Sequence, residues 1–522
     1  MVAYDHIVVG AGSAGCAVAA RLSEIQPGSV LLLEAGGSDF RLSVRAPLAY
    51  SAQMGGATDW SFQTEPEPGC ANRRMFQPRG KVLGGTSAMN AMVWVRGSAA
   101  DYDGWRVPGW CWDDVAPVFR RIESHYLGAP DHGTSGPVRV TRVAEPDEVS
   151  RRFVEAAHHS GVPTNDDIGG PELDGASISP ITVWRGGRWS TARAYLDRAR
   201  KMENFTVVSH ALARRVVLEC GRAVGVEYER RGRRHVATSS GEIVLCAGAF
   251  GTPHLLQLSG IGPAEHLRDV GIRSVVDSPL VGSNLSDHPS TYMNWELAPG
   301  FVGLADAKSP RWLLRWLFRR DGKLTSNFME ALAHVRSSPD LTEPDFQLIN
   351  GPAYVWDFGR GAHPRPAAAI IQSYWAPKSR GTVLATTPDP HVPPSIRMNT
   401  LEKYDDVRAF IRAIRLTREI AATAPLSAAL GRELHPGSAI SSDIDLETWI
   451  SATSGSTGHP AYSAAMGTGD DSVLDERLRV RGVQGLRVAD ASAFPRIPHA
   501  NTNAAAILFG ERCADFVSED DR

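Results

Sequence analysis

The stretch DHIVVGAGSAG, residues 5–15, decides how this chain folds. Its apolar run IVV predicts a buried strand of a parallel sheet, and Gly10, Gly12 and Gly15 follow with the spacing G-x-G-x-x-G. Glycine suits such a turn because the turn is tight, because its backbone comes close to a pyrophosphate, and because the next helix packs on the strand. We therefore expect a phosphate-binding turn here.

The two elements that follow this turn strengthen the interpretation. Residues 13–24, SAGCAVAARLSE, predict a helix whose N-terminal amide groups face the phosphates. A second strand ends at Glu34, about 20 residues after the glycines, where a carboxylate accepts hydrogen bonds from ribose hydroxyls. The alternative is a glycine-rich α/β turn without a ligand. The order of strand, helix, strand and acid favours dinucleotide binding, but it does not separate NAD from FAD.

Length and composition exclude several classes of protein. The chain has 522 residues, 43% of them hydrophobic and 22% charged, and a net charge of -3, which is typical of a globular protein of several domains. The balanced charge favours neither nucleic acid nor an anionic membrane as partner. The six cysteines lack paired spacing, which argues against a zinc site. Without a signal peptide or a long apolar run, we expect a cytoplasmic protein.

Further glycine-rich blocks follow along the chain. Residues 78–97, PRGKVLGGTSAMNAMVWVRG, contain a second loop at GGTS, and the VWV after it predicts a strand. Residues 241–263, GEIVLCAGAFGTPHLLQLSGIGP, predict a strand, a turn of small residues and a helix. Residues 485–492, GLRVADAS, predict another strand, and AAAILFGERCADFV near the C-terminus predicts a helix.

These blocks, together with LVGSNLSDHP at 280–289, resemble the glucose–methanol–choline (GMC) family of FAD oxidoreductases, in the right order over nearly the whole chain. The resemblance implies an α/β fold with a Rossmann-like FAD-binding domain. It also implies a discontinuous substrate domain built on a mainly antiparallel sheet with helices. The FAD domain would take residues 1–148, 186–289 and 449–522, and the substrate domain 149–185 and 290–448. Within the latter, residues 378–400 alternate like strands and residues 401–422 show helical spacing.

The resemblance also assigns residues to the cofactor. The residues expected to bind FAD are Gly10, Gly12, Ser13, Ala14, Gly15, Glu34, Gly84, Gly85, Thr86, Asn90, Ala91, Met92, Val93, Val216, Asp490, Ala491, Asn501 and Thr502. The helix that follows Asn501 would point its positive N-terminal end at the pyrimidine side of the flavin. No metal is expected.

The catalytic pair follows from the same resemblance. Residues 459–467, HPAYSAAMG, match the spacing of the family motif His-x-x-Gly-Thr-x-x-Met-Gly, so His459 aligns with the family's general base. The partner position, His or Asn in the family, falls on Asn501 in HANTNAA rather than on His499. Asn501 would hydrogen-bond the substrate oxygen, and its other interpretation is a helix N-cap.

Several positions depart from the family pattern or stay open. Gly458 stands where a large residue is common, and Tyr462-Ser463 replaces Gly-Thr, so we expect a roomier approach to the base. Glu330 is expected either to contact substrate or to form a structural salt bridge. Asp287-His288 is interpreted as a structural turn. The arginine-rich stretch 309–322 predicts an amphipathic helix that touches a membrane or a partner, or else a domain helix whose arginine stems cover apolar surface.

The function implied is FAD-dependent oxidation of a small primary alcohol, aromatic ones included, to the aldehyde, with O2 reduced to H2O2. A dehydrogenase that uses another electron acceptor is the near alternative, and a hydroxynitrile-lyase-like enzyme with a redox-idle flavin is a more distant one. The sequence does not predict the oligomeric state.

The sequence predicts a non-covalent flavin. Some GMC proteins attach FAD through a histidine of the second glycine block, and Met89 occupies that position here. Acid precipitation should therefore release the flavin into the supernatant, where its absorbance is measured. A yellow pellet and a colourless supernatant would contradict this prediction.

Overall fold

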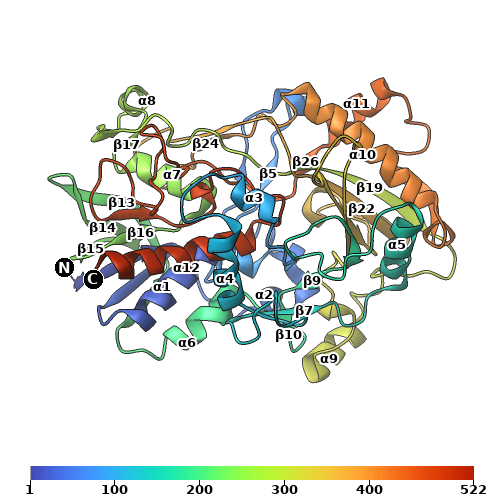
Figure 1. Cartoon of the computed structure of the whole chain (residues 1–522), viewed down its shortest axis with the longest axis horizontal. Coiled ribbons are helices and arrows are strands. Elements are labelled where there is room, and N and C mark those ends of the chain that lie inside the picture. Colours follow the sequence, from blue (N-terminus) through green and yellow to red (C-terminus); the bar gives the residue numbers. More distant parts are fainter. Residues whose placement is uncertain (1, 522) are drawn as a thin grey trace.

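The computed structural model describes residues 2–521. Its fold is mixed α/β, with a parallel sheet and an antiparallel sheet side by side along the longest axis of the molecule (Figure 1). Both termini lie at the outer end of the parallel sheet. This arrangement confirms the fold class that the sequence predicts.

The parallel sheet has five strands in the order β12, β3, β2, β16, β27. Their bounds are Phe205–Ser209, Val30–Glu34, His6–Val9, Ile243–Leu245 and Leu486–Val488. All four pairings are parallel, and β2, β3, β16 and β27 are buried along their whole length, as expected for a parallel sheet covered on both faces. Segments almost 480 residues apart in the chain therefore share one sheet.

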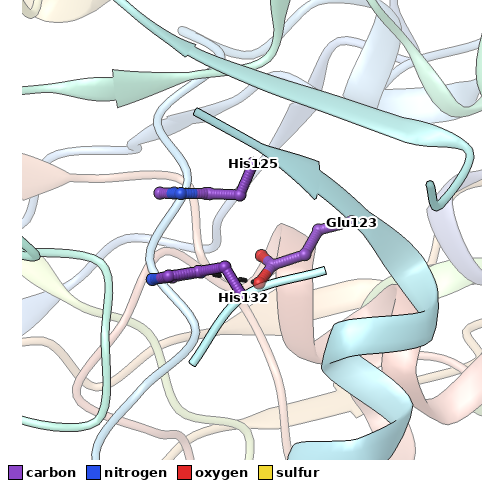
Figure 2. Close-up of side chains that lie close together, drawn as sticks. All are labelled: Glu123, His125 and His132. Carbon is purple, nitrogen blue, oxygen red and sulfur yellow. Dashed lines mark hydrogen bonds and ion pairs between the residues drawn. The ribbon is translucent and has the colours of Figure 1, made fainter. Parts of the chain in front are cut away.

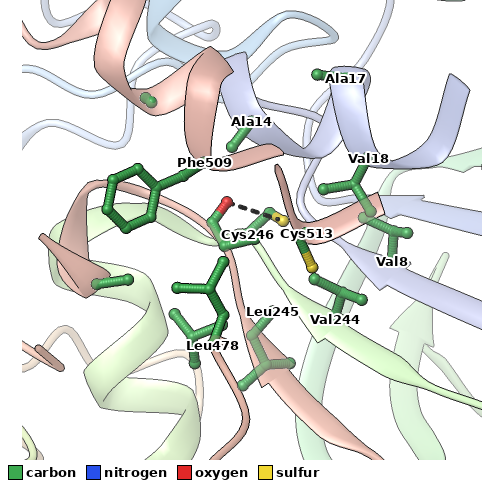
Figure 3. Packing of buried hydrophobic residues seen from close by; sticks show 14 of the residues in the cluster. Val8, Ala14, Ala17, Val18, Val244, Leu245, Cys246, Leu478, Phe509 and Cys513 are labelled. Atoms are coloured by element: carbon green, nitrogen blue, oxygen red, sulfur yellow. Dashed lines mark hydrogen bonds between the residues drawn. The ribbon is translucent and has the colours of Figure 1, made fainter. Parts of the chain in front are cut away.

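Helices α1 (Ser13–Ile25) and α12 (Asn503–Asp520) pack against each other over this sheet (Figure 3). Small residues make the close crossing possible. A Cβ added to Gly510 would lie 2.5 Å from the Ala14 carbonyl oxygen and 3.0 Å from the Ala17 Cβ. The crossing brings the N-terminus of α12 beside that of α1, where Ser13 Oγ donates to Asn503 Oδ1 at 2.7 Å.

A second sheet of the same half is formed by β1 (Val2–Tyr4), β15 (Arg233–Ser239), β14 (Arg222–Arg230) and β13 (Ala211–Glu219). Helix α7 (Gly248–Leu258) follows β16 directly. All these elements fall in the segments 1–148, 186–289 and 449–522 that the sequence assigns to the FAD domain, whose boundaries stay a prediction.

The antiparallel sheet has the order β25, β19, β22, β21, β20, β8, with β26 paired to β19. The bounds of these strands are Leu430–His435, Pro289–Leu297, Ala367–Tyr374, Phe346–Gly351, Ala331–Val335, Gly175–Ile178 and Gly455–Ser456. One face packs on helices α5 (Glu148–His159) and α10 (Tyr404–Ala422). The other face carries Tyr292, Leu332 and Ile349 toward the parallel sheet.

The structure corrects several local expectations. Residues 93–95 form only an isolated bridge, between Val93 and Ile181, rather than a strand. Within residues 378–400, β23 (Thr382–Leu384) and β24 (Ser395–Arg397) pair with each other, apart from the main sheet, and Gly381 forms an isolated bridge with Leu285. Asn501 does not cap α12, because Thr502 holds that position without a side-chain cap bond. The helix expected at 401–422 is confirmed as α10.

Helix α9 (Pro310–Arg319) forms where the sequence predicts a helix. Arginine side chains cover its two tryptophan rings, because Arg311 and Arg315 lie over Trp312 and Arg320 lies over Trp316. Its leucine and phenylalanine side chains, in contrast, are exposed to solvent. Among the described residues, no helix has both the length and the apolar character needed to cross a membrane.

Candidate active site

A cavity of about 200 Å³ lies between the two sheets. The residues that line it come from both: Ser13, Tyr50, Met54, Arg79, Thr86, Met89, Asn90, Ala91, Met92, Val93, Gly248, Ser290, Tyr292, Met329, Ile349, Val355, Phe358, Ile371, Gly458, His459, Asp490, Ala491, Asn501, Thr502 and Asn503 among others. Most of the lining is apolar, and the polar groups gather around His459 and the N-terminus of α12. This combination is typical of a small-molecule site.

Glycine is present at each of the three positions of the first turn for a different structural reason. Gly10 has φ +100°, and a Cβ there would lie 2.4 Å from the Cys246 carbonyl oxygen. A Cβ on Gly15 would lie 1.9 Å from the Gly10 carbonyl oxygen, so Gly15 lets α1 start against the strand. At Gly12 the nearest atom would be 3.9 Å away. That open side is where a pyrophosphate could approach the backbone.

The second glycine loop packs on the first. Gly84, with φ +93°, donates its amide to the Ala11 carbonyl at 2.8 Å, and a Cβ on Gly85 would lie 2.6 Å from the Gly12 Cα. Glu34 closes the same region, because its carboxylate accepts from the amides of Ala11 (2.9 Å) and Gly36 (2.7 Å). Burial raises the pKa of Glu34 to about 7 despite these two bonds.

The predicted cofactor residues fall into two groups. Ser13, Thr86, Asn90, Ala91, Met92, Val93, Asp490, Ala491, Asn501 and Thr502 line the cavity, whereas Gly10, Gly12, Ala14, Gly15, Glu34, Gly84, Gly85 and Val216 lie outside its lining. Val216 is on β13, and its amide already donates to Ser259 Oγ at 2.8 Å. The first turn of α12 borders the cavity, as the proposed helix-dipole contact requires.

His459 is held by the turn that precedes β19. The Asp287 carboxylate accepts from the His459 amide (2.8 Å), the His288 amide (2.8 Å) and the Ser456 hydroxyl. Ser456 in turn accepts from the Gly458 amide at 2.7 Å. Asp287 therefore fixes the backbone at the base and on its N-terminal side, which is more than the structural turn expected from the sequence.

The sequence analysis missed His288 as a contact of the base. His288 Nδ1 lies 3.0 Å from His459 Nδ1, and the two rings are nearly perpendicular, at 87°. Burial holds the pKa of His288 well below its usual range. Burial and the positive charge of Arg79 lower the pKa of His459 to about 3. Both rings are therefore neutral at pH 7 and share one proton between their Nδ1 atoms.

A chain of hydrogen bonds runs from the antiparallel sheet to the base. His334 Nδ1 lies 3.0 Å from the Leu173 carbonyl, and His334 Nε2 lies 3.1 Å from Gln347 Nε2. Gln347 Nε2 also donates to Asn501 Oδ1 at 3.1 Å, and Asn501 Nδ2 lies 3.3 Å from His459 Nε2. His334 and Gln347 are opposite each other on β20 and β21 and are fully buried.

The donor and acceptor roles along these hydrogen bonds determine where the protons lie. A carbonyl only accepts, so the neutral His334, whose pKa burial lowers to about 3, carries its proton on Nδ1 and accepts at Nε2. Gln347 must then donate to both His334 and Asn501, which leaves the Asn501 amide nitrogen facing His459. His459 Nε2 is therefore the unprotonated nitrogen, its proton lies on Nδ1, and His288 accepts it. His459 Nε2 accepts from the Asn501 amide at 3.3 Å, and both residues line the cavity.

His499 has another role. Its ring Nδ1 and its amide both bind the buried carboxylate of Asp101, at 2.7 and 3.0 Å. Although burial opposes it, this carboxylate raises the pKa of His499. The structure thus brings Asn501, and not His499, to His459.

Of three positions singled out near the substrate, Glu330, Tyr462 and Gly458, the first two differ from expectation. Glu330 is neither a substrate contact nor a salt bridge, because its buried carboxylate accepts from the Asp147 amide and from the Ser150 and Ser326 hydroxyls. Tyr462 packs against the core of the parallel-sheet half rather than lining the cavity. Gly458 does line it.

Gly458 is constrained by its backbone as well as by the space around it. Its φ is +84°, and a Cβ there would lie 2.9 Å from Arg79 Nη2, which donates to the Gly458 carbonyl at 2.8 Å. The extra room expected beside the base is thus partly filled by the Arg79 guanidinium. Burial lowers the pKa of Arg79 to about 10, so the group stays positively charged at pH 7.

A second cluster of titratable groups, Glu123, His125 and His132, lies away from the cavity (Figure 2). The two imidazole rings are parallel, with centroids 3.8 Å apart and planes at 10°. Ring lone pairs lie in the ring plane, so two parallel rings do not aim at one ion. His132 instead bridges Glu123 (2.7 Å) and Asp167 (2.9 Å). The cluster is a buried ion-pair network.

Comparison with known proteins agrees with this geometry. The family described as GMC oxidoreductase matches residues 4–290 with its N-terminal part and 377–510 with its C-terminal part. The chain belongs to the GMC oxidoreductase family. Among its relatives is an oxygen-dependent choline dehydrogenase of Rhizobium etli, 39% identical over 530 residues, which cover 98% of this chain and 95% of the relative. An uncharacterized GMC-type oxidoreductase of Mycobacterium tuberculosis is 39% identical over 524 residues, 98% and 99% of the two chains.

Solved GMC structures show the same fold. Pyridoxine 4-oxidase from Mesorbium loti superposes with a TM-score of 0.89 at 29% identity, over 98% of both chains. Formate oxidase of Aspergillus oryzae superposes with a TM-score of 0.93 at 26% identity, over 99% of this chain and 98% of the other. The protein is thus an FAD-dependent oxidoreductase acting on CH–OH donors, and its open Gly12 turn and the α12 N-terminus fit that cofactor.

Two substitutions in the first glycine turn test together whether it binds the FAD pyrophosphate. Gly12→Ala should leave the free energy of unfolding of the apoprotein within about 0.5 kcal/mol of wild type, because a methyl group there meets nothing closer than 3.9 Å. It should nevertheless weaken FAD binding, measured by fluorescence titration. Gly15→Ala should destabilise the apoprotein itself by about 1–3 kcal/mol or more. Equal effects of the two substitutions on apoprotein stability would contradict the assignment.

The hydrogen-bond chain predicts that Gln347 acts as a positioning residue. Gln347→Met should slow substrate reduction of the flavin about ten- to a hundredfold, with little change in KM or FAD content, because Asn501 loses the donor that orients its amide. Gln372 is the matched control, since it is equally buried on the neighbouring strand β22 and bonds Thr291 and Thr417 on the opposite face. Gln372→Met should lower stability to a similar extent without this loss of rate.

Proposed function

We propose that the protein oxidises a small, uncharged primary alcohol to the aldehyde, with O2 as electron acceptor. One observation carries the proposal: the unprotonated Nε2 of His459 accepts from the Asn501 amide at 3.3 Å, and both residues line one cavity. An alcohol oxygen that enters between them would donate its proton to His459 and accept from the Asn501 amide, replacing the direct bond between the two side chains.

Each residue near the base then has a definite task. His459 takes the hydroxyl proton on Nε2 and becomes a cation, while its Nδ1 proton stays on the bond to His288. Asn501 donates to the oxygen as negative charge develops on it, and Asp287 holds the backbone of the base. FAD, when bound, supplies the acceptor for the hydride at its N5. The low pKa of His459 means that it holds the proton well only when negative charge builds up beside it.

The size and lining of the cavity support a small substrate. Its volume of about 200 Å³ has to serve the flavin ring as well as the alcohol, and pockets for drug-sized ligands are larger, about 300–1,000 Å³. Met54, Met89 and Met329 line it together with Tyr50 and Phe358. Methionine sulfur and aromatic rings pack well against an aromatic group, so benzylic alcohols are included.

The charges around the cavity support an uncharged substrate rather than choline, although a choline dehydrogenase is among the relatives. Asp490 is the one carboxylate in the lining, and its oxygens already accept from Gly248, Thr252 and Ser492. Arg79, also in the lining, places a positive charge at the cavity. A buried trimethylammonium group would find repulsion instead of a counter-ion.

The names of the relatives support O2 as the acceptor. The choline dehydrogenase is described as oxygen-dependent, and the two solved structures are oxidases. A dehydrogenase with another acceptor and a hydroxynitrile-lyase-like enzyme are the alternatives, and the test separates all three.

The test is an alcohol panel scored for two signals. Under anaerobic conditions, benzyl alcohol and short primary alcohols should bleach the flavin, and choline should do so at least about a hundredfold more slowly, which corresponds to two tenfold steps of about 1.4 kcal/mol. In air, the same alcohols should give one H2O2 per aldehyde. His459→Ala should lower the rate of bleaching by several orders of magnitude, and His235→Ala, an exposed histidine on β15, should not change it.

The outcomes distinguish the alternatives. Bleaching without peroxide indicates a dehydrogenase, and cyanide release from a hydroxynitrile without bleaching indicates a lyase. Full reduction by the His459→Ala variant would overturn the role of the base. Rapid bleaching by choline would overturn the argument from charge while leaving alcohol oxidation intact.

A further inference from the structure

Helix α9 exposes an unusual concentration of large apolar side chains. Leu313 is 38% exposed, Leu314 54%, Leu317 43% and Phe318 83%. Of the fourteen large hydrophobic residues exposed among those described, four therefore lie within six consecutive positions of one ten-residue helix. Scattered exposed leucines need no explanation, but a contiguous apolar patch marks an interaction site.

The four residues form a single outward arc. At about 100° per residue, Leu313, Leu317, Leu314 and Phe318 follow one another over about 140° of the helix circumference. The opposite side is anchored to the protein: Trp316 is buried, and its Nε1 donates to the Gly186 carbonyl at 2.6 Å. The helix is therefore held against the protein with its apolar arc exposed to solvent. Figure 1 shows α9 at the outer edge of the molecule.

The arginines line one edge of this arc. On a helical wheel with Pro310 at zero, Phe318 lies at about 80°. Arg311, Arg315 and Arg319 follow it at about 100°, 140° and 180°. The segment from Asp306 to Lys323 contains six lysines and arginines and two aspartates, a surplus of four positive charges. Arg311 and Arg315 have acidic partners in Asp306 and Asp321, whereas no ion pair among the described residues engages Arg319.

The structure assigns this patch, defined as Leu313, Leu314, Leu317 and Phe318 with their flanking arginines, to docking on an anionic lipid surface. A helix with an apolar outer arc and arginines along its edge lies in the plane of a membrane interface. Its apolar side chains enter the acyl boundary, and its cations remain among the headgroups. The proposal concerns attachment to one leaflet, independent of the chemistry at the cavity.

The charge pattern favours a lipid surface over a second copy of this chain. Two copies meeting through α9 about a two-fold axis would bring equal positive charges together. Their unpaired Arg319 side chains would gain no acidic partner from the other copy's α9. An anionic leaflet supplies negative charge to all of them and an apolar layer to the leucines.

The test is co-sedimentation of the FAD-loaded protein with vesicles. Wild type should bind vesicles of phosphatidylcholine and phosphatidylglycerol in equal parts at about 50 mM salt, and far less at about 500 mM, where the Debye length is much shorter. Pure phosphatidylcholine vesicles should bind it weakly. Phe318→Asp and Leu314→Asp should each lower the partition coefficient at least about tenfold, and Arg319→Glu should lower it mainly at low salt.

Ile444→Asp is the matched control, because Ile444 is 78% exposed on the remote helix α11 (Asp443–Thr453). It should bind vesicles as wild type does, and every variant should keep its FAD and its unfolding temperature. Absence of binding to the mixed vesicles, or equal binding by the Phe318→Asp variant, would overturn the proposal. A dimer in sedimentation velocity that Phe318→Asp dissociates would assign the patch to self-association instead.

Discussion

The orientation of the Asn501 amide is the constraint on which the site depends. Asn501 comes from the segment before α12, in the parallel-sheet half, but its carbonyl is fixed by Gln347 from the antiparallel sheet. Gln347 is fixed in turn by His334 and, through it, by the Leu173 carbonyl. Every bond in this chain has only one possible direction once the first is set. The two halves of the molecule therefore determine together which ring nitrogen of His459 carries no proton, and neither half would do so alone.

Burial gives this arrangement its chemical use. In water, a histidine is partly protonated near neutral pH, but the surroundings of His459 lower its pKa to about 3 and keep it neutral. His288 contributes by accepting the Nδ1 proton without carrying charge itself. A base of this kind does not take a proton from water. In the proposed reaction it would take one from a bound alcohol as the alcohol loses its hydride, so proton and hydride removal would be coupled by electrostatics.

The sequence predicts the helices and strands of the fold better than it predicts the hydrogen-bond network of the site. Strands β2 and β3 and helices α1, α10 and α12 follow from apolar periodicity and glycine spacing, which are local properties. His459, Asn501 and the preference over His499 follow from motif spacing, and the structure places them together. Gln347 and His334 carry no local signal, because a polar residue in a buried strand shows its role only when its neighbour across the sheet is known. The expectation for Glu330 was wrong for the same reason, since two of its three partners, the Asp147 amide and the Ser150 hydroxyl, lie 183 and 180 residues away in the sequence.

On the cavity face of strand β21, the residue that orients the catalytic hydrogen bonds is a different one from the residue that shapes the substrate pocket. Gln347 and Ile349 point to the cavity face, whereas Phe346 and Leu348 pack into the core with α10. On the cavity face, Gln347 serves the hydrogen-bond chain and Ile349, two residues on, serves the lining. A change at Ile349, Ile371 or Tyr292 would alter the shape offered to the substrate without breaking any bond of the chain. A change at Gln347 would act on the base through Asn501 without contacting the substrate. The lining residues of this sheet can therefore change to fit other alcohols while the hydrogen bonds that keep His459 Nε2 unprotonated stay the same.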